Sequence, residues 1–350
     1  MPKIGEYFFS LATEKRRGLV ASVVKAFLFI FSLIYGLVAW ALIFLKRRNP
    51  CRLSCKVISV GNLTLGGTGK TTTVEFVARY LTEQGRKVAV LSRGRTGAQN
   101  LGDEPAMLSK KLEGVPVIAD TDRIRGARRA IAEHGADTVI LDDGLQQWHI
   151  EKDLEIVTID AGCPFGNGYL LPRGILRQPL SSLSQPGVFV LTKINLYPDT
   201  RKIKDTLARF YPSAQVIEAL HQPMGFYELS QPQRRLPVDA LAGQPVALFS
   251  GIGDPGSFEK LTSGLGAKVE LSLRFGDHHH YTAADLEKIS MAAKDKNINV
   301  LITTEKDAAR FYDIRSTISD LRILVLQIQL GFKDDGKDRF YNRLRALYSL

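Results

Sequence analysis

Short apolar runs alternate with longer segments of helical periodicity along most of this chain. The first clear apolar run, residues 56–60, is followed by a Gly-rich segment and then by a helical pattern over residues 73–84. Apolar runs of this length without a polar face are typical of strands in a mostly parallel sheet that helices cover on both faces. The same pattern predicts further strands at 88–92, 138–142, 155–160 and 188–192, and helices at 126–134 and 201–211.

A polar, proline-containing stretch at residues 231–237 predicts a break in this series. A second series of strands and helices begins beyond it and predicts a smaller α/β lobe, and residues 337–350 predict a final helix. Two such lobes with a cleft between them are common in kinases that close on their substrates. The predicted strands of the second series are 246–250, 268–273, 299–303 and 322–328.

Residues 62–72 read Asn-Leu-Thr-Leu-Gly-Gly-Thr-Gly-Lys-Thr-Thr, between a predicted strand and a predicted helix. That context is typical of a phosphate-binding P-loop, in which glycines let backbone N–H groups face one anion. Lys70 adds a charge near the outer phosphates, and the Thr71 hydroxyl can hold Mg²⁺. The usual loop has Gly at the position of Thr64, and a simple Gly-rich turn would not explain Gly-Lys-Thr. We expect ATP to be bound by Thr64, Leu65, Gly66, Gly67, Thr68, Gly69, Lys70 and Thr71.

Composition and charge narrow the class of protein. The 350 residues, 45% of them hydrophobic, suffice for one large or two medium domains, and the formal net charge is +11. A basic surface suits anionic lipids or phosphorylated substrates, although a merely basic soluble protein is the plain alternative. Three cysteines at unpaired spacings predict free thiols and no zinc site. Nucleic-acid-binding signatures are absent from the sequence, so we do not expect nucleic acid as a partner. An obligate protein partner is not evident from the sequence either. Asn195 stands where a guanine-reading motif needs Asp, which argues against GTP.

Residues 26–45 form an uncharged apolar segment near the N-terminus. As a helix it would reach roughly 30 Å, the thickness of a hydrocarbon core. Basic residues flank it on both sides, at 15–17 and 46–48, so the positive-inside rule selects no orientation. A helix that lies in one leaflet keeps both flanks and the nucleotide site on the cytoplasmic side. We therefore expect membrane contact, with monotopic insertion favoured over a span and over a buried core helix.

Two carboxylates, Asp142 and Asp143, end a predicted buried strand. A carboxylate at the end of such a strand beside a P-loop can hold Mg²⁺ directly or through water. The alternative is a turn before Gly144 that an Asp side chain caps. Arg93 ends another strand, where it would either neutralise phosphate or lie on the surface.

A second acidic pair, Asp103 and Glu104, precedes Pro105. Since Pro105 suits the first turn of a helix, either carboxylate could be a helix N-cap. The functional alternative is a general base that takes a proton from an acceptor hydroxyl.

Half of the six histidines lie in the segment from Asp277 to Tyr281. Three consecutive histidines cannot all face one metal ion in regular structure, so the segment favours a loop that enters a helix. One histidine could pair with a carboxylate and tune its basicity.

Together these motifs resemble the tetraacyldisaccharide 4′-kinase family, the lipid A 4′-kinases of Gram-negative bacteria. The resemblance runs in order from about residue 20 to residue 310. The motifs that carry it are Val60-Gly61-Asn62-Leu63-Thr64 with the P-loop, Ser92-Arg93-Gly94, Gly102-Asp103-Glu104-Pro105, Asp142-Asp143-Gly144-Leu145-Gln146, Phe165-Gly166-Asn167-Gly168, Leu171-Pro172-Arg173-Gly174, Gly251-Ile252-Gly253, Asp277-His278 and Thr304-Glu305-Lys306-Asp307.

The resemblance implies transfer of the ATP γ-phosphate to the 4′-hydroxyl of a tetraacyldisaccharide 1-phosphate at the cytoplasmic face of the inner membrane, giving lipid IVA. It implies Asp103 as the general base with His278 as its assistant, and Asp142 and Asp143 near Mg²⁺. It also implies a two-stranded linker, here 215–229 paired with 322–330, that returns the last helix to the first lobe. We expect the lipid substrate to contact Asn62, Arg93, Glu104, Arg123 and Arg173.

This interpretation divides the chain into a membrane-associated region (1–48), a P-loop kinase domain (49–228), a smaller α/β lobe (229–321) and a return strand with a C-terminal helix (322–350). Two positions depart from the family pattern: Gln147 replaces a usual His, and Arg95 replaces a usual aromatic residue. The rival functions are a membrane-associated P-loop ATPase without a lipid acceptor and a nucleotide-gated membrane adaptor, neither of which requires Asp103 and His278 together.

Overall fold

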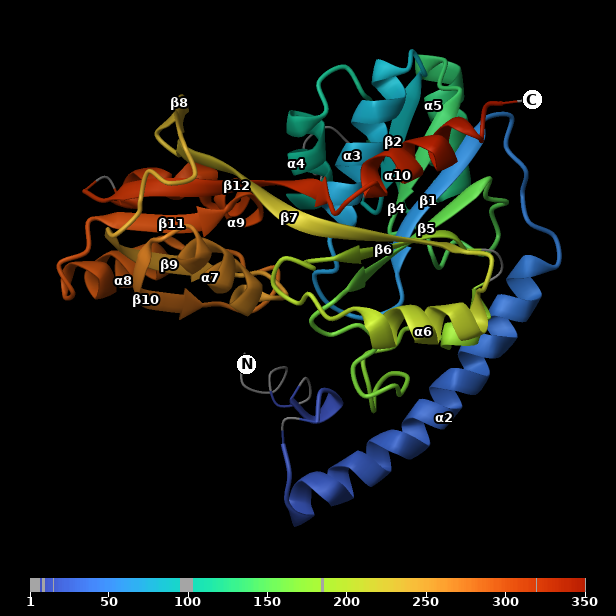
Figure 1. The fold of residues 1–350 in the computed structure, drawn as a ribbon, viewed down its shortest axis with the longest axis horizontal. Helices are drawn as coiled ribbons and strands as arrows, with labels where there is room; N and C mark the ends of the chain where they lie inside the picture. Colours follow the sequence, from blue (N-terminus) through green and yellow to red (C-terminus); the bar gives the residue numbers. More distant parts are fainter. Residues whose placement is uncertain are drawn as a thin grey trace. The chain divides into compact units, whose positions relative to one another are not determined.

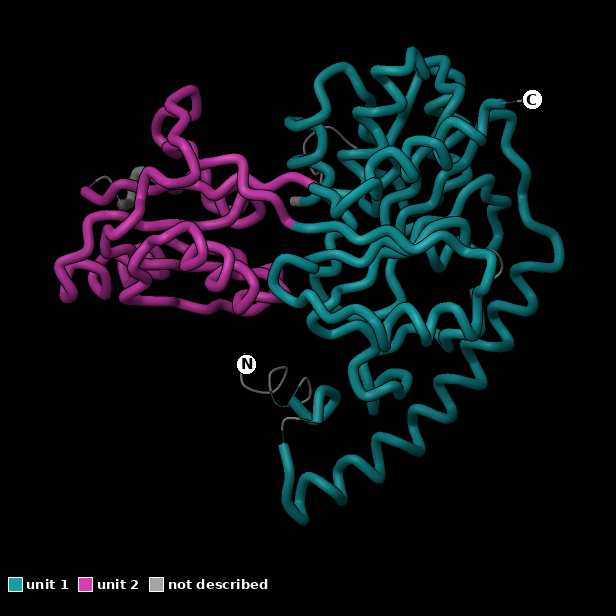
Figure 2. Tube along the Cα trace, in the orientation of Figure 1, with its two compact units in different colours: residues 1–220, 331–350 teal, residues 221–330 magenta. Residues whose placement is uncertain are grey.

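The computed structural model describes residues 7, 10–14, 16–94, 103–183, 186–318 and 320–349, and it forms two compact units. Unit 1 comprises residues 1–220 and 331–350, and unit 2 comprises residues 221–330 (Figure 2). The division falls within strands β7 (Gln215–Glu228) and β12 (Arg322–Phe332), which are hydrogen-bonded neighbours. The predicted pairing of these two segments is therefore confirmed, with Leu229 N donating to Ile323 O at 2.9 Å.

The strands of unit 1 form a wholly parallel sheet in the order β7-β6-β5-β1-β4-β2-β3 (Figure 1). The predicted parallel sheet is thus confirmed. β1 lies at its centre, between strands that follow it much later in the sequence, which makes the carboxyl end of β1 a switch point where open α/β sheets bind ligands. The strands are β1 (Lys56–Asn62), β2 (Val88–Ser92), β3 (Val117–Ala119), β4 (Thr138–Asp142), β5 (Leu154–Asp160) and β6 (Pro186–Thr192).

Helices cover the unit 1 sheet and bury its apolar side chains. α5 packs Ala127 and Ala130 against Val139 in one core cluster, and α6 packs Leu207 against Phe189 in another. Both clusters follow from strands that are apolar on both faces. The helices are α3 (Lys70–Glu83), α4 (Asp103–Lys111), α5 (Arg123–His134), α6 (Arg201–Phe210) and α10 (Gly336–Arg345), with a short 3-10 turn η1 (Leu180–Ser182).

The C-terminal helix belongs to unit 1, as the sequence predicted. The ring of Phe76 on α3 lies 4.8 Å from Phe332, 5.6 Å from Phe340 and 5.5 Å from Tyr341. Aromatic contacts of this kind fix the last helix against the helix that follows the P-loop.

The apolar N-terminal segment forms one long helix, α2 (Leu19–Arg47), which exceeds the predicted range at both ends. By length and composition it is the one helix within the described residues that could cross a membrane. Most of its large apolar side chains are exposed, Leu19 and Leu37 among them, so the alternative of a buried core helix is wrong. It contacts the rest of unit 1 through Tyr35, whose Oη donates to Arg177 O at 2.8 Å.

Unit 2 has the strand order β10-β9-β11-β12-β7, and β8 pairs with β7 (Figure 1). β9, β10, β11 and β12 are mutually parallel. The remaining elements of this unit are β8 (Gln231–Leu236), β9 (Pro245–Ser250), α7 (Pro255–Gly264), β10 (Lys268–Arg274), α8 (Ala283–Lys294), β11 (Val300–Thr304), α9 (Glu305–Phe311) and η2 (Tyr312–Ile318).

One sequence prediction fails in unit 2, and one short strand of unit 1 was not predicted. The predicted break at 231–237 is wrong, because β8 forms there and pairs antiparallel with β7. Its Pro232 is tolerated because β8 pairs with one neighbour only, so a residue without an N–H does not interrupt a central ladder. The three-residue β3 was not predicted, since it is too short to show a period.

Candidate functional site

The Gly-rich loop connects the carboxyl end of β1 to the first residue of α3, Lys70. Gly66 and Gly69 adopt φ values of 114° and 82°, a conformation that side chains disfavour, which explains the glycines at these two positions. Thr64 needs no such freedom, because its φ is not positive. It is buried and forms an antiparallel bridge with Leu176. The backbone at this position therefore accepts Thr in place of the usual Gly.

The buried side chain of Asn62 braces the loop and Lys70 together. Its Nδ2 donates to Thr64 O at 2.6 Å, and its Oδ1 accepts from Lys70 Nζ at 3.2 Å and from Arg177 Nη1 at 3.1 Å. Thr68 Oγ1 lies 2.8 Å from Thr158 Oγ1, which ties the loop to β5. The predicted P-loop residues therefore lie on one continuous, braced loop that ends at a helix N-terminus, a ready-made site for phosphate.

Asp142 ends β4 next to β1, where its side chain is almost fully buried. Burial, with the nearby charge of Glu104, raises its pKa to about 6, and Lys70 and a hydrogen bond from Ser92 oppose this increase. Ser92 Oγ donates to Asp142 Oδ2 at 3.0 Å. A desolvated carboxylate of this kind gains free energy when a cation binds beside it.

Asp143 has a different partner, Arg177. Arg177 Nη1 donates to Oδ1 at 2.8 Å and Nη2 donates to Oδ2 at 3.1 Å, a bidentate pair. Burial raises the pKa of Asp143, but the bonds from Arg177 and the charge of Lys70 outweigh it, so that the pKa is lowered. Sequence reasoning missed Arg177, since nothing local distinguishes it from the other arginines. Its role depends on partners 34 and 115 residues away.

The remaining predicted substrate contacts divide into two groups. Arg123 is buried, and its electrostatic neighbours include Asp142, Asp143 and Arg93, so these residues lie at the same corner of unit 1. Arg173 lies elsewhere: it pairs with Glu14, and its guanidinium lies 4.8 Å from the centre of the Tyr169 ring. The Arg173 side chain is thus engaged by Glu14 and Tyr169, and its contact with the lipid substrate stays a prediction.

The residues at this corner fit a divalent cation. Asp142 supplies a buried carboxylate and Thr71 a hydroxyl in the first turn of α3, whereas both oxygens of Asp143 are engaged by Arg177. Over the described ranges, no group of three or more His, Cys, Asp or Glu side chains could hold a metal. This donor set suits Mg²⁺, which commonly takes one or two protein oxygens and completes its shell with phosphate and water.

The proposed base lies partly outside the described structure. Asp103 is the first residue of α4, but its side chain lies outside the described structure. Arg95, one of the two departures from the family pattern, lies entirely outside the described residues. Gln147 is described and partly buried, in the loop that follows Asp143.

The histidine segment lies in unit 2. His278 follows β10 and has φ 58°, and His279 Nε2 lies 3.1 Å from Asp285 Oδ2. The predicted loop into a helix is confirmed, because Thr282 caps α8.

The chain resembles one family over nearly its whole length. The family model described as tetraacyldisaccharide-1-P 4′-kinase (LpxK) matches residues 24–347. A tetraacyldisaccharide 4′-kinase from Halothermothrix orenii is 36% identical, and the alignment covers 95% of each chain. One from Syntrophus aciditrophicus is 37% identical over 73% of this chain and 75% of its own. Among solved structures, LpxK from Aquifex aeolicus in complex with ATP has a TM-score of 0.70 at 24% identity, covering 93% of this chain and all of that one, which supports the fold.

Proposed function

This chain belongs to the tetraacyldisaccharide-1-P 4′-kinase family, and from that premise we propose that it transfers the γ-phosphate of ATP to the 4′-hydroxyl of a tetraacyldisaccharide 1-phosphate. The product is lipid IVA, a precursor of lipid A. The family match over residues 24–347 carries this proposal. The braced P-loop with Lys70 supports it independently, because transfer of a phosphoryl group needs chiefly positioning and charge neutralisation.

Each residue of the proposed reaction has a simple task. The P-loop amides and Lys70 hold the triphosphate, and Asp103 takes the proton of the 4′-hydroxyl as its oxygen bonds to the γ-phosphorus and ADP leaves. His278 assists Asp103. Thr71 and Asp142 would hold Mg²⁺, which supplies neutralisation of charge on the phosphates. Arg177 keeps Asp143 and Asn62 in register with the loop.

The membrane assignment is a second part of the proposal. α2 exposes a long apolar surface and carries Lys46 and Arg47 in its last turn. We place this helix in the cytoplasmic leaflet of the inner membrane, where its basic end meets anionic headgroups and the enzyme meets its lipid substrate. A monotopic position keeps the P-loop and the basic N-terminal segment on the same side.

The first test measures transfer of labelled phosphate from ATP to a tetraacyldisaccharide 1-phosphate in mixed micelles. Wild-type protein should yield lipid labelled at the 4′-position, and Lys70→Ala should yield none. Asp103→Ala should lose transfer and retain ATP binding. Asp205→Ala, which replaces an exposed carboxylate on α6, is the matched control and should transfer normally. Hydrolysis of ATP without labelled lipid would instead support the ATPase alternative, and normal transfer by Asp103→Ala would remove Asp103 as the base.

A further inference from the structure

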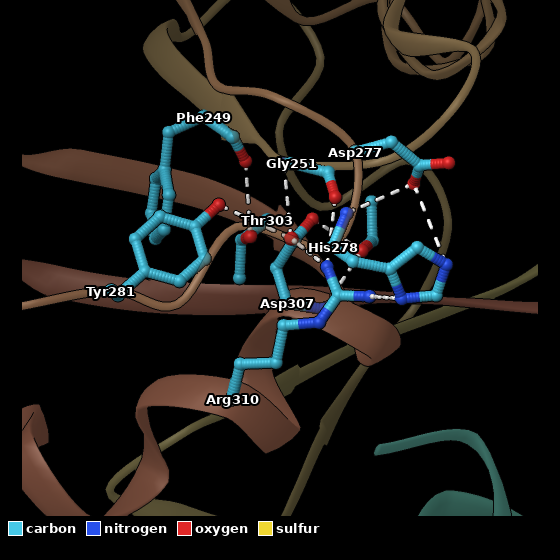
Figure 3. Close-up of polar contacts among 9 residues, drawn as sticks. Phe249, Gly251, Asp277, His278, Tyr281, Thr303, Asp307 and Arg310 are labelled. Carbon is cyan, nitrogen blue, oxygen red and sulfur yellow. Dashed lines mark hydrogen bonds and ion pairs between the residues drawn. The ribbon is translucent and has the colours of Figure 1, made fainter. Parts of the chain in front are cut away.

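A buried arginine in unit 2 contacts the ring of His278 (Figure 3). Arg310 Nη2 lies 3.1 Å from His278 Nδ1. The Arg310 side chain is 1% exposed, whereas the His278 side chain is 57% exposed. The imidazole therefore has one edge fixed against the protein interior and the other edge, with Nε2, toward the surroundings.

This contact determines where the proton of His278 resides. A guanidinium has only donors, so Nδ1 must accept and cannot carry a proton. A neutral ring then has its single proton on Nε2. The opposite ring orientation would place a C–H group against the guanidinium and lose the acceptor, so the contact also selects the orientation of the ring.

A dense network holds Arg310 in place. Its Nη1 donates to Gly251 O at 2.7 Å and to Asp307 Oδ1 at 3.2 Å. Asp307, fully buried, also accepts from Gly251 N at 3.0 Å, from Tyr281 Oη at 3.1 Å and from Thr304 Oγ1 at 2.7 Å. These four groups all donate to one carboxylate, which fixes the position of the guanidinium.

The backbone of the histidine loop is part of the same network. His278 N donates to Gly251 O at 3.1 Å, the same carbonyl that accepts from Arg310. A Cβ atom at Gly251 would lie 3.0 Å from His279 Cβ, 3.1 Å from Gly276 O and 3.3 Å from Asp307 Oδ1. The absence of a side chain at Gly251 thus permits strand end, loop and buried ion pair to pack together.

We propose that Arg310, anchored by Asp307, is a positioning residue that holds His278 as the neutral Nε2–H tautomer, with Nε2 as a hydrogen-bond donor. This inference rests on the proposed function, in which His278 assists Asp103. In that role His278 would offer Nε2–H as a hydrogen-bond donor and would not itself take the proton of the acceptor. Asp277 Oδ1 lies 4.0 Å from Nε2, beyond hydrogen-bond distance, so it does not satisfy this donor.

The test observes the tautomer directly. Full-length protein labelled with ¹⁵N-histidine is studied by NMR in detergent micelles at about pH 8, where an ordinary imidazole is neutral. His278 should show a pyrrole-type shift at Nε2 and a pyridine-type shift at Nδ1, and the exposed His280 should show the average of a mixture. A pyrrole-type shift at Nδ1 of His278 in the wild-type protein would overturn the proposal.

The double variant described below removes the donor without leaving a buried charge unpaired. Arg310→Met alone would strand the anion of Asp307, so the informative variant is Arg310→Met with Asp307→Asn, compared with Asp307→Asn alone. Only the double variant should move His278 to a mixture of tautomers. Arg315→Met is the matched control, since Arg315 donates to Tyr312 O and lies over the Tyr312 ring in the same unit. An unchanged His278 spectrum in a folded double variant would refute the proposal.

Kinetics connects the tautomer to the reaction. Misplacing a catalytic group by a small distance lowers rates by about 10²-fold, so we expect the double variant to lose kcat by about that factor at unchanged KM for ATP. Arg310→Lys, which keeps the charge, should retain part of the rate. If His278 has the expected tautomer but wild-type protein phosphorylates no lipid, the positioning role stands and the proposed function fails. If lipid is phosphorylated but the tautomer does not depend on Arg310, the reverse holds.

Discussion

Replacing Asp142 by Asn should stabilise the folded protein while it removes activity. Burial raises the pKa of this carboxyl from the ordinary 3.8 to about 6. The native state therefore binds more protons than the unfolded state between pH 4 and pH 6, and stability falls as the pH rises through this window. Since one pKa unit corresponds to 1.36 kcal/mol, the ionised carboxylate destabilises the fold by about 3 kcal/mol at pH 7.

Asn is a suitable replacement because its amide oxygen can still accept from Ser92 Oγ, so no buried hydroxyl is left unpaired. We expect Asp142→Asn to exceed wild-type stability by up to about 3 kcal/mol at pH 7 and by close to zero at pH 4. Thermal or urea unfolding in one detergent, repeated from pH 4 to pH 8, measures the difference. Lipid phosphorylation by the same samples should be lost.

Asp143→Asn is the matched control, because the pKa of Asp143 is shifted in the opposite direction from that of Asp142. The pKa of Asp143 is lowered and its carboxylate pairs with Arg177, so this variant should be less stable than wild type at pH 7. Mg²⁺ with ATP should stabilise wild type more than Asp142→Asn, since only wild type offers the carboxylate. A stability gain for Asp142→Asn that is independent of pH would refute the electrostatic reasoning.

Three further predictions concern packing and the membrane. In Gly61→Ala the new Cβ would lie 2.5 Å from Leu145 Cβ and 2.8 Å from Leu145 N, so urea unfolding should show that the free energy of unfolding falls by about 3 kcal/mol. In the control Gly264→Ala the new Cβ meets nothing within 4 Å, so this variant should keep its stability. Equal unfolding midpoints for the two variants would contradict the close approach. Tyr35→Phe removes a 2.8 Å hydrogen bond from α2 to the main chain beside the P-loop and should cost about 1 kcal/mol, measured by the same unfolding; no change would show that the contact is dispensable. Deleting residues 1–45 should release the protein from liposomes in a flotation assay. Undiminished flotation would contradict the assignment of α2 to the membrane.

The sequence determined the features that are local in the chain. The strands at 88–92 and 138–142 coincide with β2 and β4, because five consecutive apolar-rich residues suffice to define a strand that is buried on both faces. The P-loop was predictable for the same reason, since its glycines, Lys70 and the flanking strand and helix occupy contiguous positions. The start of α7 is equally local, because its N-cap Asp254 and its first residue Pro255 are consecutive in the chain.

Tertiary structure alone decided which side chains meet. The bond from Arg177 to Asn62 joins residues 115 apart, and the contact from Arg310 to His278 joins residues 32 apart, so no periodicity or spacing encodes either pair. The fold likewise pairs Arg173 with Glu14, 159 residues away, which no local motif predicts. β8 likewise exists because β7 offers it an edge, despite the proline that predicted a break. A sequence pattern indicates the burial and the backbone conformation of a residue, whereas its side-chain partners depend on how distant segments pack. That packing gives the adjacent residues Asp142 and Asp143 opposite pKa shifts, raised for Asp142 and lowered for Asp143.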